Sequence, residues 1–191
     1  MPRRKKGNPV HGWVNLYKPP GLTSTQALGK IRRILKAQKA GHAGTLDPLA
    51  TGILPVALGE ATKLIPFMQD REKEYIFEVS FGEQRDTDDL EGEIINTSDV
   101  IPSRDGIIAA LPRFTGTISQ IPPLYSAIKI EGQRAYDLAR RGQLPDIKPR
   151  EVHIESLEMI SCGERTAAFR TVCGKGTYIR SLARDLSVEL G

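Results

Sequence analysis

The sequence has little cysteine and no long apolar run. Its two cysteines, Cys162 and Cys173, flank or lie in β-like segments on either side of Gly163-Glu164-Arg165. If this triplet is a hairpin turn, Cys162 pairs near Thr166 and Cys173 near Glu155. The two thiols would then not face each other, so we expect reduced cysteines and no disulfide.

The absence of long apolar segments excludes a membrane protein of the helical kind. No apolar run approaches the roughly 20 residues that a membrane-spanning helix needs, and the basic N-terminus lacks the apolar stretch of a signal peptide. We therefore expect a cytoplasmic protein with no membrane partner. The length of 191 residues is that of one large domain or of a domain with a small appendage, and the apolar share of 39% is that of a globular protein.

Acidic residues are absent from the first 46 positions. These positions hold ten Lys or Arg, a charge of +10, while the rest of the chain carries −6. Such asymmetry indicates a nucleic acid or another polyanion as partner. One basic group lies in a tail at 1–9, and a second comprises Lys30, Arg32, Arg33, Lys36 and Lys39. The alternative is a disordered tail followed by a solvated helix face.

The patterns along the chain predict a mixture of helices and strands. Thr23 and Gln26 have the spacing of a capping box and predict the start of a helix. Its apolar stripe is expected to comprise Ala27, Ile31, Ile34 and Leu35, with the basic residues opposite. Further helices are expected at 60–69, after Pro102, at 135–141 and at 179–190. Strands are expected at 12–17, 75–81, 152–160 and 166–173, and an apolar run spans 53–58.

Asp47, the first acidic residue of the chain, lies in a loop rich in Gly, Thr and Pro. The segment 41–52 reads Gly-His-Ala-Gly-Thr-Leu-Asp-Pro-Leu-Ala-Thr-Gly. A carboxylate in such a loop, beside a histidine and a basic segment, suits a catalytic acid or nucleophile that acts on a polyanion. The structural alternative is an Asx-turn residue that hydrogen-bonds the Asp-Pro loop.

Five segments together resemble the TruB family of tRNA pseudouridine synthases. Residues 41–63 resemble its central motif. The others resemble its first motif, its tyrosine motif, its substrate-clamping insert and its last catalytic motif: 18–24, 73–75, 120–129 and 174–182. They occur in family order at family-like spacings. One departure is Arg85, which stands where many members have Thr.

The resemblance implies an α/β fold of the α+β type. This pseudouridine-synthase fold has a mixed, mostly antiparallel central sheet flanked by helices and loops. It implies a catalytic domain over 10–191 that follows the basic tail 1–9. Family members continue with a strand that closes the active site and usually with a PUA-type RNA-binding domain. Neither is present in these 191 residues, so we expect a pocket open on one side and low activity.

The resemblance also assigns roles to residues in the reaction that converts uridine 55 of the tRNA T-loop to pseudouridine. It implies Asp47 as the nucleophile or base, Arg180 as its ion-pair partner, and Tyr75 and Tyr178 as the aromatic pair around a flipped base. His42 would take the place of the flipped nucleotide. Basic residues are expected to contact phosphates: Lys18, Lys30, Arg32 and Arg33. We expect no metal, no cofactor and a monomer that binds the tRNA T-stem-loop.

Two other segments bear on partners. The acidic residues Glu83, Asp86, Asp88, Asp89, Glu91 and Glu93 lack the spacing of a calcium loop, which favours a solvated loop or a brace for basic residues. The basic segment 129–150 would be the family's mobile clamp on the tRNA stem-loop, or else a plain surface loop and helix. Two other functions stay open: a non-catalytic tRNA-binding or tRNA-folding module, and a hydrolase of N-glycosidic bonds.

Overall fold

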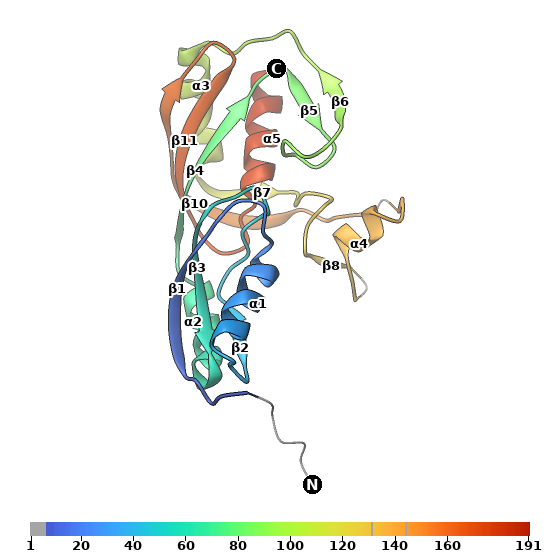
Figure 1. Ribbon diagram of the computed structural model, residues 1–191. Coiled ribbons are helices and arrows are strands. Elements are labelled where there is room, and N and C mark those ends of the chain that lie inside the picture. Colours follow the sequence, from blue (N-terminus) through green and yellow to red (C-terminus); the bar gives the residue numbers. More distant parts are fainter. Residues whose placement is uncertain (1–6, 131, 144) are drawn as a thin grey trace. The chain divides into compact units, whose positions relative to one another are not determined.

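The computed structural model describes residues 7–130, 132–143 and 145–191 (Figure 1). Its contacts divide the chain into two compact units, the first ending at Arg71 and the second running from Glu72 to Gly191. Each unit is described by itself. Most of the expected basic tail, including Arg3, Arg4, Lys5 and Lys6, lies outside the described residues.

The first unit contains a small antiparallel sheet with helix α1 packed on it (Figure 1). Its strands are β1 (Gly12–Lys18), β2 (Ala40–His42) and β3 (Gly52–Leu58), in the order β1-β3-β2. Helix α1 (Ser24–Ile34) buries its apolar side against this sheet, in a core that contains Ala27, Leu54 and Val56. The strand expected at 12–17 is confirmed, and the apolar run at 53–58 is the third strand.

Helix α1 begins as the sequence predicts. The Thr23 hydroxyl accepts a hydrogen bond from the Gln26 amide at 3.1 Å, and the Gln26 side chain accepts one from the Thr23 amide at 2.8 Å. The stripe differs at one position, because Ile34 is 74% exposed. Ala27, Ile31 and Leu35 follow an i, i+4 row toward the core. Ile34 instead continues the exposed row that starts at Lys30.

The helix expected at 60–69 is two shorter pieces. A 3₁₀ segment, η1, spans Gly59–Leu64, and the α-helix α2 spans Ile65–Gln69. Pro66 explains the break. A proline lacks the amide that a helix interior needs, so it is tolerated only in the first turn of a helix.

The second unit contains a four-stranded antiparallel sheet in the order β4-β11-β10-β7. Its elements are β4 (Lys73–Ser80), β5 (Glu83–Arg85), β6 (Ile94–Thr97), α3 (Arg104–Ala110), η2 (Leu111–Phe114), β7 (Gly116–Gln120), β8 (Lys129–Ile130), β9 (Gln133–Arg134), α4 (Ala135–Ala139), β10 (Arg150–Cys162), β11 (Thr166–Cys173) and α5 (Ile179–Leu190). The prediction of an α/β chain with antiparallel sheets is confirmed.

The core of the second unit lies between this sheet and helices α3 and α5 (Figure 1). Leu182 and Leu186 of α5 are fully buried and pack with Phe169 and Ile154 of the sheet. The rings of Phe77 and Phe169 stack at 5.3 Å. Burial of each such side chain contributes about 1.5–3 kcal/mol, so α5 is firmly seated on the sheet.

The predicted hairpin of β10 and β11 is present, with a small change of register. Cys162 pairs with Ala167 and Cys173 with Ile154, because two irregularities in β10 shift the pairing. Both cysteines are free thiols. Cys173 is fully buried, and burial raises the pKa of its thiol.

Candidate active site

The Asp47 loop joins β2 to β3 and is held by hydrogen bonds on both sides of Asp47. Before it, the Ser24 hydroxyl donates to the Leu46 carbonyl at 3.1 Å and accepts from the Leu46 amide at 2.9 Å. After it, the Pro48 carbonyl accepts from the Gly21 amide at 2.9 Å. The turn closes where the Ala50 amide donates to the Asp47 carbonyl at 3.1 Å. The half-buried carboxylate thus stands on a loop of defined shape.

Lys18 lies beneath this loop and is fully buried. Its ammonium donates to the carbonyls of Leu22, Pro48 and Pro19 at 2.7, 3.2 and 3.0 Å. Burial lowers the pKa of this ammonium, and the nearby negative charge of Asp47 opposes part of the shift.

The placement of Lys18 corrects the expectation that it contacts phosphates. An ammonium has three protons to donate, and all three carbonyl partners here belong to the protein. The side chain is therefore committed to the turn after β1 and to the Asp47 loop. Its positive charge still acts on Asp47 from within the protein.

His42 ends β2 and is half-buried. Its Nδ1 makes a short hydrogen bond with the Gly44 carbonyl, which requires the proton on Nδ1. This contact fixes the ring beside the Asp47 loop. The expected role of His42 toward a flipped nucleotide stays a prediction.

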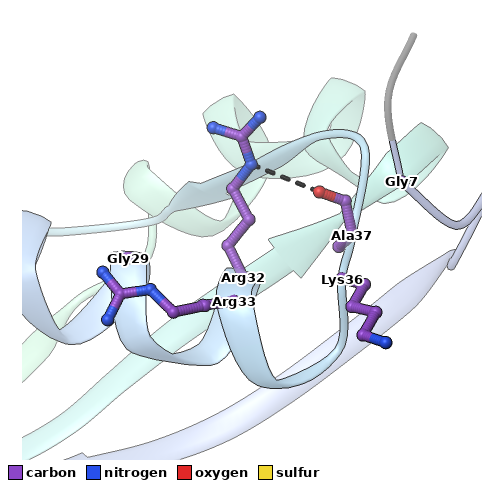
Figure 2. A pocket seen from close by; sticks show the side chains of 6 residues that line it. All are labelled: Gly7, Gly29, Arg32, Arg33, Lys36 and Ala37. Carbon is purple, nitrogen blue, oxygen red and sulfur yellow. Dashed lines mark hydrogen bonds between the residues drawn. The ribbon is translucent and has the colours of Figure 1, made fainter.

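The basic side chains of α1 gather at its C-terminal end. A surface pocket there is lined by Gly7, Gly29, Arg32, Arg33, Lys36 and Ala37 (Figure 2). The expected exposed basic face is present, since Lys30, Arg32 and Arg33 are all exposed. Arg32 also stabilises the segment after the helix, because its guanidinium donates to the carbonyls of Ala37 and Gln38 at 3.2 and 3.3 Å.

In the second unit, Arg180 lies in the first turn of α5 and is largely buried. Its guanidinium donates to the carbonyls of Thr87 and Tyr125 at 2.8 and 3.0 Å, and it lies 3.5 Å from Asp89 Oδ2. These contacts fix the direction of the side chain. The expected pairing of Arg180 with Asp47, a residue of the first unit, stays a prediction.

The two expected aromatic residues occupy different elements of the second unit. Tyr178 is the N-cap residue of α5, and its amide donates to Gln120 Oε1 at 2.8 Å. Tyr75 lies on β4, on the same face as Phe77 and Val79, and packs against the core. Both tyrosines are half-buried. Their contact with a base stays a prediction.

Residues 7–130, 132–143 and 145–191 contain neither a cluster of metal-ligand side chains nor a helix that could span a membrane. Within the part of the chain that the structure describes, no three His, Cys, Asp or Glu side chains are grouped as metal ligands would be. Among the same residues, no helix has the length and apolar character that crossing a membrane requires.

Most of the chain matches a known protein family. The TruB family pseudouridylate synthase N-terminal domain matches residues 32–179. The chain belongs to the TruB family. The match includes the Asp47 loop, Tyr75 and Tyr178, and ends one residue before Arg180.

Relatives of this TruB-family chain carry one common name. A tRNA pseudouridine synthase B of Bradyrhizobium diazoefficiens is 56% identical over 189 residues, which are 98% of this chain and 55% of the relative. One from Sinorhizobium medicae is 55% identical over 190 residues, 100% of this chain and 61% of the relative. The chain therefore spans between one half and two thirds of the length of these two relatives.

A solved structure shares the fold. The crystal structure of a Cbf5-Nop10-Gar1 complex contains a chain that matches with a TM-score of 0.70 and 33% identity, over 94% of this chain and 44% of that one. The likeness shows that the α/β architecture with antiparallel sheets of this TruB-family chain also occurs in a chain of that complex.

One group of residues around Arg180 was not identified from the sequence. Arg184, one turn further along α5, donates to Asp88 Oδ2 at 2.8 Å. The acidic stretch around Asp88 was expected to be a solvated loop or a brace for basic residues, and the second alternative is confirmed. The only local signal is the i, i+4 spacing of Arg180 and Arg184, which places both guanidinium groups on one side of α5 but does not point to Asp88.

Proposed function

We propose that this chain carries the active site of a tRNA pseudouridine synthase that converts uridine 55 of the T-loop. The observation that supports this most directly is the Asp47 loop of a TruB-family chain, held on both sides by Ser24, Gly21 and Lys18. A catalytic group must be placed accurately before substrate arrives, and these hydrogen bonds hold the backbone on both sides of Asp47.

The reaction is an isomerisation in which no atom is gained or lost. The bond from C1′ to N1 breaks, a bond from C1′ to C5 forms, the proton leaves C5, and N1 gains a proton. The Asp47 carboxylate would attack C1′ or C6 of the base, or remove the C2′ proton, and so divide one difficult step into easier ones. A base inside folded tRNA must first flip out, so the enzyme needs a pocket for it.

The proposed reaction assigns roles to further residues, which are divided between the two units. Arg180 would hold the Asp47 carboxylate through a planar, two-pronged contact and keep it ionised. Tyr75 and Tyr178 would supply flat surfaces for the flipped uracil, and Tyr75 would accept the C5 proton. His42 would occupy the place that the nucleotide leaves. The half-buried state of both tyrosines and the fixed guanidinium of Arg180 support these roles.

The exposed basic end of α1 would bind the RNA backbone. Lys30 and Arg33 are exposed, and Arg33 and Lys36 line the pocket of Figure 2. Contacts of this kind position an RNA and give affinity that depends on salt, but they carry no sequence information. We further propose a single catalytic domain over 10–191 that works as a cytoplasmic monomer without a cofactor.

One experiment separates this function from its two competitors. An unmodified tRNA transcript is incubated with the chain, then weighed by mass spectrometry and mapped for pseudouridine. Isomerisation leaves the mass unchanged and converts the T-loop uridine. A hydrolase of the N-glycosidic bond would release uracil and add the atoms of one water to the RNA, so the RNA mass would fall; a binding or folding module would leave both mass and uridine unchanged.

A further inference from the structure

An ion pair between Asp88 and Arg184 lies next to Arg180 in the second unit. Arg184 Nη1 donates to Asp88 Oδ2 at 2.8 Å, and Arg184 Nη2 donates to the Ile121 carbonyl at 2.8 Å. The remaining nitrogen, Nε, donates to Asp185 at 2.9 Å. Every nitrogen of the Arg184 guanidinium therefore has a hydrogen-bond partner, and these contacts hold the side chain in one orientation.

The pair is unfavourably placed for a contact that serves stability alone. The Asp88 side chain is only 9% exposed and that of Arg184 is 19% exposed. Burial raises the pKa of Asp88, although Arg184 and Arg180 both favour its ionised form. Asp88 also has a left-handed backbone, with φ of 56°. Buried pairs often contribute no more to stability than apolar residues of the same size, so stability alone does not explain this pair and a second role is open to it.

The position of Asp88 in the chain supplies that role. Its neighbours on both sides, Thr87 and Asp89, contact Arg180: the Thr87 carbonyl at 2.8 Å and Asp89 Oδ2 at 3.5 Å. A shift of Asp88 would move both contacts at once. Arg184 prevents this shift, because it ties Asp88 to the same helix that carries Arg180, one turn away.

We propose that Asp88 and Arg184 form a positioning pair that sets the direction of the Arg180 guanidinium. The pair does this through the backbone of 87–89 rather than by contact with RNA. The inference rests on the proposed role of Arg180 in the reaction. It assigns Asp88 and Arg184 to the reaction as positioning residues and not as catalytic ones.

The first test reads Arg180 directly and needs no activity. The variants are Asp88→Asn, which keeps a residue that tolerates the left-handed backbone, and Arg184→Gln. The control is Arg170→Gln, which breaks an exposed pair with Glu74 at 3.6 Å in the same unit. We expect the Arg180 Nε–Hε signal in NMR spectra to shift in both test variants and to stay in the control. An Arg180 signal that is unmoved in both test variants would overturn the proposal.

The second test measures single-turnover pseudouridine formation together with tRNA affinity. Misplacement of a reacting group costs rate, so we expect each test variant to be slower by about 10- to 100-fold, with unchanged affinity. In an Arg180→Lys background, Arg184→Gln should add almost nothing. A full additional loss there would mean that the pair acts independently of Arg180, and the proposal would fall.

The two tests separate this inference from the proposed function. If the unaltered chain forms no pseudouridine, the proposed function fails, while the NMR signal of Arg180 still decides whether the pair positions it. If the chain is active but the signal and the rate stay unchanged in both variants, the positioning role fails and the proposed function stands.

Discussion

Single residues decide the shape of the Asp47 loop, and Lys18 contributes most. Its ammonium joins the turn after β1 to the Pro48 carbonyl, next to the carboxylate that the reaction is proposed to use. A charged group at a fully buried position is costly unless hydrogen bonds compensate it. Here three carbonyls and the charge of Asp47 do so.

Replacement of Lys18 by Met tests this account of the loop. Three carbonyls would lose their donor, so we expect the free energy of unfolding to fall by about 2–4 kcal/mol and pseudouridine formation to fall with it. Urea unfolding monitored by circular dichroism measures the first effect. A variant of unchanged stability would contradict the role of Lys18.

The same variant changes the pH dependence of stability in a defined direction. The pKa of Lys18 is lowered from 10.5 in the folded chain, so the unfolded chain binds more protons in the interval between the two values. The free energy of unfolding of the unaltered chain should therefore rise as the pH approaches 10.5. The Met variant should lack this contribution.

Arg180 is the second residue whose chemistry can be tested alone. Its guanidinium reaches the Thr87 and Tyr125 carbonyls at once, and the proposed contact with Asp47 requires a planar, two-pronged group. A lysine has one compact ammonium, so Arg180→Lys should not restore activity. Single-turnover rates of this variant and of the exposed Arg170→Lys are the comparison. A near-normal rate for Arg180→Lys would rule out the pairing.

At the scale of elements, α1 serves the proposed site at both of its ends. Ser24, in its first turn, hydrogen-bonds both polar groups of the Leu46 backbone, which precedes Asp47. Its last turn carries Arg32 and Arg33, and the pocket of Figure 2 lies there. One amphipathic helix therefore shapes the Asp47 loop and presents positive charge to solvent.

The basic end of α1 predicts a change in the salt dependence of tRNA binding. In a plot of log binding constant against log salt concentration, each phosphate contact that is lost should make the slope shallower by about 0.9 for duplex nucleic acid. We expect this in a Lys30→Gln, Arg33→Gln variant, with unchanged stability. Adding Arg32→Gln should also lower stability, because Arg32 holds the Ala37 and Gln38 carbonyls. An unchanged slope would mean that this face does not contact RNA.

Elements with strong local signals were predictable from the sequence. The capping box of Thr23 and Gln26 predicted the start of α1, and the helix expected at 179–190 has the bounds of α5. Local signals were insufficient where a contact with a residue distant in the sequence determines the position of a side chain. Lys18 looks like a surface base in the sequence, but its partners include Pro48, 30 residues away. Likewise Arg184 and Asp88 are 96 residues apart, and no local pattern joins them.

At the scale of the whole molecule, the residues to which the proposed function assigns roles are divided between the two units. The first unit supplies Asp47, His42 and the basic face, and the second supplies Arg180, Tyr75 and Tyr178. Family resemblance identified these residues, because the motifs are local strings. It did not identify what holds them, namely the buried ammonium of Lys18 and the pair of Asp88 and Arg184. Those depend on tertiary packing, which the structure supplies.

The most direct test of the central claim is the replacement of Asp47 by Asn. The substitution keeps the size of the side chain and the Leu46, Pro48 and Ala50 hydrogen bonds of the loop, and it removes the ionised oxygen. Pseudouridine mapping of a tRNA transcript should show no conversion, while tRNA affinity stays within a few-fold of the unaltered chain. Continued conversion would contradict the role of Asp47, and a parallel loss of binding would make it a structural residue of the loop.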